Sequence, residues 1–166
     1  AELVERAKTD AEAFGVLYER HVDAIFNYIY YRTSDRQVAE DLTARTFYNA
    51  LNKIGSYVQR GAPFTSWLYR IAHNLTANWH RDQKRWRMSS LSDAFEGFHR
   101  SQAPTPHAEA ERQESVALLM AVIAELPEDR QQLLLLKYVE NMSNAEISRV
   151  MGRTEGAVKS LYHRTL

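Results

Sequence analysis

The chain has 166 residues, of which 45% are hydrophobic and 25% are charged, as in ordinary soluble globular proteins. This length holds one ordinary domain or two small ones. The absence of cysteine excludes disulfides and thiolate metal sites, and it fits a reducing cytoplasm. The N-terminal stretch AELVERAKTD lacks the apolar core of a signal peptide, and no apolar run reaches the roughly 18 residues of a membrane helix.

The formal net charge is +0, but the charges are unevenly distributed along the chain. Residues 64–87 carry five cationic residues against one acidic residue, and residues 149–166 carry four against one. The stretch 88–127 carries six acidic residues against two cationic ones. Local basic patches bind phosphate whatever the sum over the chain. The charge pattern therefore keeps nucleic acid among the candidate partners.

Apolar residues recur at three- and four-residue steps while glycine and proline are scarce, which predicts an all-α fold. A capping box at 9–12 predicts a first helix that ends near Thr33, and a second box at 34–37 predicts a helix that ends at Gly55. The first helix has the apolar stripe Phe14, Leu17, Tyr18, Val22, Ile25 and Ile29. The second has Val38, Leu42, Phe47, Leu51 and Ile54.

A Gly-Ala-Pro break at 61–63 precedes a third long helix, predicted over about 65–87. Residues 88–110 are rich in Ser, Pro and acids and have no sustained period, which predicts a flexible linker. A segment this long without structure is uncommon inside a compact domain, so we predict two domains, 1–87 and 111–166. Pro127 followed by Glu128 and Asp129 predicts a helix start, and apolar residues follow it. These are Leu133, Leu134, Leu136 and Tyr138.

The most specific local pattern is 143–165, which opens with a third capping box at 143–146. Two short helices are predicted, at about 143–151 and 154–165, with Gly152 at the left-handed position between them. The spacing of Ile147, Met151, Val158 and Leu161 predicts a helix-turn-helix, whose second helix fits the major groove. Its exposed residues would be Arg153, Thr154, Glu155, Lys159, Ser160, His163 and Arg164. A helical hairpin that packs on another protein has the same spacing.

The helix predicted over 65–87 has two unlike faces. Its apolar face comprises Trp67, Leu68, Ile71, Leu75 and Trp79, most of which we assign to the core. Its polar stripe comprises Arg70, His73, Asn74, Ala77, His80, Arg81 and Lys84. Cations that hold phosphate and amides that read base edges, next to aromatic residues, are typical of single-stranded nucleic-acid binding. A solvated basic face over a core stripe is the alternative.

The six histidines do not predict a metal or catalytic site. His73 and His80 share a face, but no carboxylate lies at ligand spacing from them. No metalloprotease, nucleotide-loop or hydrolase motif is present in the sequence. We therefore expect no catalytic residue, no metal and no cofactor.

Three stretches, in this order, resemble the extracytoplasmic-function group of the sigma-70 family. They are Ala39-Glu-Asp-Leu42 with Thr46-Phe47, then Phe64-Thr-Ser-Trp-Leu-Tyr-Arg-Ile-Ala-His-Asn74, then Leu126-Pro-Glu-Asp-Arg130 with the helix-turn-helix. The resemblance covers about 10–87 and 111–166. It implies two small helical domains, a region 2 bundle and a region 4 helix-turn-helix, joined by a flexible linker.

The resemblance also implies a function: the chain would bind core RNA polymerase and direct promoter-specific initiation. Helix 35–54 would dock on the β′ clamp helices through Glu40, Asp41 and Phe47, and region 4 would contact the β flap. The family commonly has Gln-Glu where this chain has Ala44-Arg45. An anti-sigma factor would control the protein in the cytoplasm, and the chain would have no membrane segment of its own.

The resemblance assigns DNA contacts by position. Asn74 would capture a base flipped from the −10 element, in a pocket shaped by the loop 55–64. The other −10 contacts would be Arg70, His73, Asn78, Arg81, Lys84 and Arg85. The −35 element would be read by the exposed residues of the second helix of the helix-turn-helix.

Two other functions fit parts of the sequence. A helix-turn-helix repressor or activator that works without polymerase accounts for the C-terminal half and leaves the polar stripe of 65–87 without a role. An enzyme with a DNA-binding appendage requires a catalytic constellation, which the sequence lacks. Binding to core polymerase separates the first alternative from a sigma factor.

Overall fold

The computed structural model describes residues 2–58, 63–89, 122–123 and 125–165, and these residues contain helices and no strand. The N-terminal half comprises α1 (Glu2–Arg6), α2 (Ala11–Thr33), α3 (Arg36–Lys53), a 3₁₀ turn η1 (Ile54–Ser56) and α4 (Phe64–Ser89). The C-terminal half comprises α6 (Glu128–Leu134), a π-helical turn η2 (Leu135–Val139), α7 (Asn144–Met151) and α8 (Glu155–Thr165). The all-α prediction is therefore confirmed.

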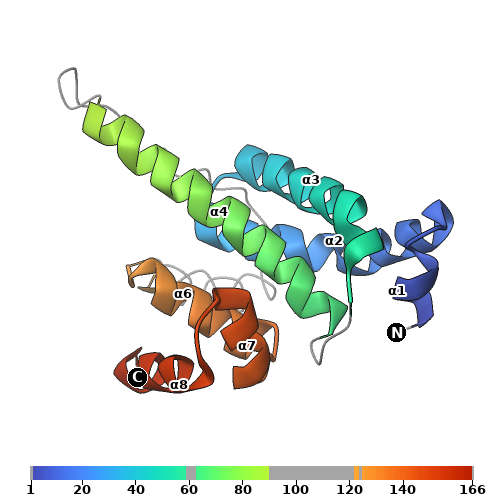
Figure 1. Ribbon diagram of the computed structural model, residues 1–166. Helices are drawn as coiled ribbons and strands as arrows, with labels where there is room; N and C mark the ends of the chain where they lie inside the picture. The colour runs from blue at the N-terminus through green and yellow to red at the C-terminus, as the bar shows by residue number, and fades with distance from the viewer. Residues whose placement is uncertain (1, 59–62, 90–121, 124, 166) are drawn as a thin grey trace, which may run out of the picture.

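The central element is α4, which has α1–α3 on one side and α6–α8 on the other (Figure 1). Its predicted span, 65–87, is confirmed with short extensions at both ends. The apolar face of α4 packs on α2 and α3, while α7 packs against a different part of its surface. The predicted linker lies outside the described residues from 90 onward, as does most of the helix expected after 111.

Aspartates cap the two helices that precede α4. The Asp10 carboxylate accepts the backbone N–H of Glu12 at 2.9 Å, and the Asp35 carboxylate accepts the N–H of Val38 at 3.0 Å. Both N-caps lie one residue later than predicted, because each predicted hydroxyl is followed at once by a carboxylate, itself a strong N-cap. Ser34 instead ends α2 in the left-handed region, at φ 52.

The core of the N-terminal half is formed where α2, α3 and α4 meet. Ile25, Ile29 and Leu68 are fully buried there, and Leu42 is nearly so. Two predicted stripe residues are wrongly assigned, since Tyr18 is 43% exposed and Leu51 is 48% exposed. Helical spacing alone does not show where a stripe reaches the edge of its partner helix.

The C-terminal half contains the predicted helix-turn-helix. Its capping box is complete, since the Ser143 hydroxyl accepts the N–H of Glu146 and the Glu146 carboxylate accepts the N–H of Ser143. Gly152 adopts φ 65 between α7 and α8, as predicted. Ile147 and Val158 are fully buried where the two helices cross. Residues that the sequence spacing predicted for the contact, Ile147 and Val158, therefore form the contact between α7 and α8.

The leucine run before the helix-turn-helix differs from its prediction. Leu133, Leu135 and Leu136 are buried, whereas Tyr138 is 57% exposed. The π-helical turn η2 adds a residue to the turn and so shifts the register of the side chains by one position. A prediction based on a constant helical period could not include that shift.

None of the helices in the described ranges combines the length and the hydropathy that a bilayer-crossing segment needs.

We expect Gly152→Ala to destabilise the chain by about 1–2 kcal/mol, because an L-residue in the left-handed region is strained. The space around Gly152 is open, so the loss would come from the backbone alone. Gly156→Ala is the matched control, since Gly156 is helical and equally uncrowded. It should be neutral or stabilising by up to about 1 kcal/mol. Urea denaturation of both variants measures the difference, and equal stabilities would contradict the prediction.

Candidate nucleic-acid interface

The polar face of α4 consists of two parallel rows of side chains. The first row comprises Arg70, His73, Ala77, His80 and Lys84. The second row comprises Asn74, Asn78, Arg81 and Arg85. Each member of the second row directly follows a member of the first, so the rows are rotated by about 100° around the helix axis. All four residues of the second row are exposed, and Arg81 donates a hydrogen bond to the side-chain oxygen of Asn78 at 2.6 Å.

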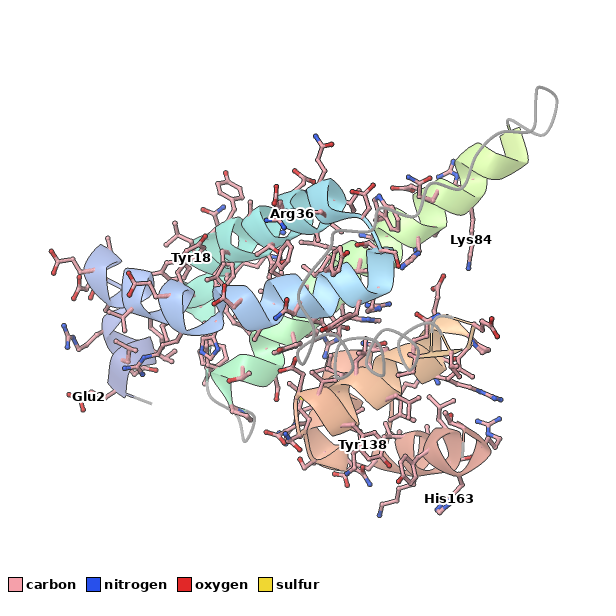
Figure 2. All side chains as sticks on the ribbon, turned by 180° about the vertical axis from the view of Figure 1, so that it is seen from behind. Glu2, Tyr18, Arg36, Lys84, Tyr138 and His163 are labelled. Carbon is pink, nitrogen blue, oxygen red and sulfur yellow. The ribbon has the colours of Figure 1, made fainter. Side chains whose placement is uncertain are left out.

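The first row faces the C-terminal half of the chain. At one end, the Arg70 guanidinium donates a hydrogen bond to the main-chain oxygen of Arg149 at 3.2 Å. At the other end, the Lys84 ammonium lies 2.9 Å from a carboxylate oxygen of Glu128, and His80 Nδ1 lies 3.9 Å from the same oxygen. In Figure 2 the Lys84 side chain points from α4 toward the C-terminal helices.

A small cavity of about 190 Å³ lies between the ends of this row. From the N-terminal half, Arg32, His73 and Ala77 line it. The C-terminal half contributes Glu128, Asp129, Gln132, Met151 and Arg153. The middle of the first row therefore also faces the C-terminal half.

Buried polar groups join the two halves beneath this cavity. The Gln132 side chain is 2% exposed and donates a hydrogen bond to the Tyr28 hydroxyl at 3.1 Å. Arg32, 6% exposed, donates to the same hydroxyl at 3.1 Å and lies 3.4 Å from His73 Nδ1. Its guanidinium also lies over the Tyr28 ring, 5.4 Å from the centroid. Sequence reasoning missed these contacts, because the partners are far apart in the chain.

This environment shifts the titration of the first row. Burial, reinforced by the positive charges of Arg32, Arg70 and Arg153, lowers the pKa of His73 to about 4. Burial also lowers the pKa of His80, although the charge of Glu128 partly opposes that effect. Both imidazoles are therefore neutral near pH 7 and can accept or donate a hydrogen bond without carrying charge.

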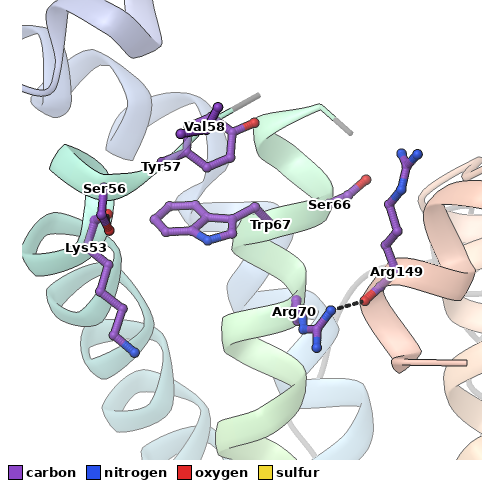
Figure 3. Close-up of a pocket in the computed structure, with 8 residues that line it drawn as sticks. All are labelled: Lys53, Ser56, Tyr57, Val58, Ser66, Trp67, Arg70 and Arg149. Carbon is purple, nitrogen blue, oxygen red and sulfur yellow. Dashed lines mark hydrogen bonds between the residues drawn. The ribbon is translucent and has the colours of Figure 1, made fainter. Parts of the chain in front are cut away.

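A second cavity, of about 330 Å³, lies at the start of α4 (Figure 3). Its lining residues are Lys53, Ser56, Tyr57, Val58, Ser66, Trp67, Arg70 and Arg149. The rings of Tyr57 and Trp67 lie 5.0 Å apart. The Ser66 hydroxyl is buried and has no hydrogen-bond partner among the described residues. The cavity thus offers aromatic rings and cations to a flat polar ligand.

The sequence predicted part of this second cavity. Ser56 to Val58 belong to the loop expected to shape a pocket, and 59–62 lie outside the described residues. Trp67 was assigned to the core, and it is half-buried, so it packs on the core and lines the cavity as well. Lys53, at the end of α3, was missed, because nothing in its helical spacing distinguishes it from other exposed lysines.

The outer face of α3 carries a stripe of exposed residues at three- and four-residue spacing. Glu40 and Asp41 are both exposed and pair along the helix with Arg36 at 2.9 Å and Arg45 at 3.6 Å. The other exposed members are Ala44, Tyr48 and Leu51. Exposed apolar and aromatic side chains on one helix face, such as Tyr48 and Leu51, are a feature of surfaces that dock other proteins.

The prediction that Phe47 contacts a partner needs correction. Phe47 is 5% exposed and packs edge-on against Tyr18, with ring centroids 4.7 Å apart. It supports the outer face of α3 from the core and does not reach its surface.

All seven residues predicted on the recognition face of the helix-turn-helix are exposed. Three of them also make hydrogen bonds or ion pairs within the chain, including Arg164, which donates to the main-chain oxygen of Ser160 at 3.3 Å. Arg153 pairs with Asp129 at 3.2 Å, and the Thr154 hydroxyl accepts the N–H of Ala157 at 3.2 Å at the start of α8. Within the parts of the chain that the structure describes, no three His, Asp or Glu side chains are grouped to hold a metal.

Comparisons with known proteins match both halves of the chain. Residues 17–86 match the family described as Sigma-70 region 2, and residues 117–166 match Sigma-70, region 4. The ECF RNA polymerase sigma factor BldN of Streptomyces coelicolor is 38% identical over 99% of this chain, which spans 62% of BldN. RNA polymerase sigma factor YlaC of Bacillus subtilis is 30% identical over 89% of this chain and 84% of its own length. The RNA polymerase sigma-H factor of Pseudomonas aeruginosa is 32% identical over 98% of this chain and 88% of its own length.

Solved structures share the fold. CnrH in complex with the cytosolic domain of CnrY matches with a TM-score of 0.71 and 23% identity, over 98% of this chain and 89% of that chain. The sigma factor RpoE in complex with the anti-sigma factor NepR from Bartonella quintana matches with a TM-score of 0.69 and 20% identity. The match covers 92% of this chain and 91% of that chain.

We expect His73 to stay neutral down to about pH 5, because its pKa in the structure is about 4. A histidine whose pKa is lowered by burial stabilises the buried arrangement fully above about pH 6.5, and that stability is lost as the pH falls toward 4. NMR titration of the imidazole signals measures this pKa, and His73→Gln assigns the signal. A midpoint near 6.5 would mean that His73 is not buried in solution.

Proposed function

The chain belongs to the sigma-70 family of RNA polymerase sigma factors, in its extracytoplasmic-function group, and we propose that it binds core polymerase and directs promoter-specific initiation. The observation that carries this proposal is the order of parts. An exposed docking face on α3, a polar face on α4 and a helix-turn-helix follow one another within the two matched regions.

We assign the domains as 1–87, for region 2, and 111–166, for region 4, with a linker over 88–110. The match of region 2 to residues 17–86 and the end of α4 at Ser89 support the first boundary. The match of region 4 to 117–166 supports the second. The acidic composition of the linker suits a path through a polymerase channel built to hold nucleic acid.

The exposed face of α3 is the surface that we assign to the β′ clamp helices. Glu40 and Asp41 supply its charge, and Tyr48, 67% exposed, supplies apolar area that would be buried on docking. Aromatic residues are enriched in protein interfaces, and charged residues at the rim help to select and steer the partner. Region 4 would contact the β flap, so that polymerase holds both domains near their promoter elements.

The second row of α4 is the surface that we assign to the −10 element. Asn74 would capture a flipped base, and Asn78, Arg81 and Arg85 would hold the adjacent strand. Flipping costs a few kcal/mol, which stacking and hydrogen bonds must offset. The cavity beside Tyr57 and Trp67 offers rings for that stacking. Arg70, His73 and Lys84, assigned to the same element by resemblance, are engaged with the C-terminal half in this conformation.

The exposed face of α8 would read the −35 element as duplex DNA. Arg153, Thr154 and Glu155 lie at the N-terminal end of the helix, which in such motifs approaches the base edges. Lys159 and Arg164 would neutralise phosphates, and Ser160 and His163 share their exposed face.

We further propose that an anti-sigma factor restrains this protein, since a sigma factor that is always free would initiate transcription constantly. The RpoE neighbour was solved with such a partner. The protein would work in the cytoplasm, where polymerase is, and would have no catalytic activity of its own. A repressor that works without polymerase is disfavoured because region 2 and the exposed face of α3 would have no role.

Binding to core polymerase tests the proposal directly. We expect the purified chain to co-elute with core enzyme and to direct initiation in run-off transcription from a promoter selected by the holoenzyme. Asp41→Lys should weaken binding about tenfold, or about 1.4 kcal/mol, by reversing a charge on the docking face. Asp23→Lys is the matched control, because Asp23 is exposed on α2, away from that face. A chain that does not bind core would contradict the proposal.

We expect Asn74→Ala to reduce promoter opening about tenfold or more while leaving binding of the holoenzyme to duplex DNA nearly unchanged, because the amide acts on the unpaired base. Permanganate reactivity of −10 thymines measures the opening, and filter binding measures the affinity. Asn27→Ala, at an exposed asparagine of α2, serves as the control. Equal opening by the two variants would remove Asn74 from the base pocket.

A further inference from the structure

The two acidic residues on the exposed face of α3 are each paired with a cation of the same helix. The Arg36 guanidinium lies 2.9 Å from the Glu40 carboxylate, and the Arg45 guanidinium lies 3.6 Å from the Asp41 carboxylate. All four side chains are more than half exposed, so both pairs lie on the surface that we assign to polymerase. The acids of this face are therefore not presented to a partner as free negative charges.

The two pairs differ in the surroundings of their cations. Arg36 begins α3, and its guanidinium also lies over the Phe26 ring, 6.0 Å from the centroid. Arg45 lies in the middle of α3 and pairs with Asp41 one turn earlier. An exposed pair at this spacing adds little to the stability of a fold, because water screens both charges. Arg45 can therefore be replaced without loss of the fold, and its effect on binding can be measured by itself.

Arg45 also lies next to the exposed aromatic residue of the same face. Residues three and four positions apart are neighbours on a helix surface, so Arg45 has Asp41 on one side and Tyr48 on the other. Tyr48 is 67% exposed, and Leu51, three positions further along, is 48% exposed. A partner that covers both Asp41 and Tyr48 must therefore cover Arg45 as well. A cationic group of that partner would compete with Arg45 for the Asp41 carboxylate.

We propose that Arg45 masks Asp41 on the exposed face of α3 and thereby limits the affinity of the chain for core polymerase. The Asp41 carboxylate is already paired, so its charge adds little to the attraction between the two proteins. Exposed apolar area at Tyr48 and Leu51 supplies most of that attraction, which makes binding only weakly dependent on salt. The masking rests on the proposed function, because it concerns the surface that we assign to polymerase.

Competition of unlabelled variants with a fluorescent parent chain for core polymerase tests the proposal. Arg45→Gln removes the charge and keeps a similar helix propensity. We expect this variant to bind core about threefold to tenfold more tightly than the parent, and its affinity to fall more steeply with added salt, because the Asp41 charge becomes available to the partner. Arg45→Lys keeps the positive charge and should bind like the parent. Weaker binding of Arg45→Gln would show that Arg45 itself attracts polymerase, and would overturn the proposal.

A double-mutant cycle tests whether Arg45 acts through Asp41. Asp41→Asn removes the carboxylate that Arg45 pairs with. In this background, Arg45→Gln should change the affinity for core by less than about twofold, because no charge remains to be unmasked. A gain in affinity as large as that in the parent chain would overturn the masking, since Arg45 would then act without Asp41.

Arg20→Gln is the matched control for the loss of an exposed arginine. Arg20 is exposed on α2, two residues after Tyr18, which packs on Phe47 of α3. Two residues correspond to about 200° of rotation around the helix axis, so Arg20 points away from α3. Arg20→Gln should therefore bind core like the parent. Circular dichroism and urea denaturation of each variant serve as the folding controls.

The outcomes distinguish this proposal from the proposed function. If neither the parent nor Arg45→Gln binds core polymerase, both the sigma-factor function and the masking are wrong. If both bind core with equal affinity and equal salt dependence, the masking alone is wrong. Tighter and more salt-dependent binding of Arg45→Gln, lost in the Asp41→Asn background, is the result that supports the masking.

Discussion

The packing of the C-terminal half on α4 is the constraint on which this structure depends. The helix α4 packs against both halves of the chain. Its apolar face forms the core with α2 and α3, and its polar face contacts α6 and α7. A helix can do this only while its two faces keep constant directions over its whole length. The 26 residues of α4 provide that length, and Lys84 near its end still meets Glu128.

Buried polar groups set the position of this packing. Gln132 and Arg32 both donate to the hydroxyl of Tyr28, so a shift of one helical turn would leave buried donors without partners. Each such loss costs about 1–3 kcal/mol, which is a large fraction of the free energy of a typical fold. A hydrogen bond that is formed contributes less to the free energy of folding than is lost when its buried donor has no partner. The contact is thus specific in register and modest in net strength.

The ionic part of the interface is exposed enough to respond to its surroundings. The Lys84 side chain is 71% exposed and its partner Glu128 is 39% exposed, so added salt screens this pair. Neutral His73 adds no charge to this balance until it is protonated, and burial opposes that protonation. The side chains of this row that meet the C-terminal half thus include some that we propose as DNA contacts.

The amino-acid sequence by itself determined the helices, the helix-turn-helix and the polar face of α4, because these depend on local spacing, caps and a single glycine. It placed Asn74 and the exposed residues of α8 correctly on the surface. Its apolar spacing also placed Phe47 correctly in the core, and only the partner contact that the family resemblance implied for Phe47 is at odds with its burial. It misplaced Tyr18, Leu51 and Tyr138, since the edge of a core and a π-helical shift of register depend on neighbouring elements. The helical spacing of apolar residues in the sequence contains no information about the edge of the core or about the shift of register.

Only the tertiary structure decided that the polar face of α4 consists of two rows with different partners. The row from Arg70 to Lys84 meets the C-terminal half, and the row beginning at Asn74 meets solvent. The residues concerned are chemically alike and adjacent in sequence, so no pattern in the chain distinguishes them. The distinction arises because Glu128 and Gln132 come from more than forty positions away, and their approach direction selects one row by about 100° of helix rotation.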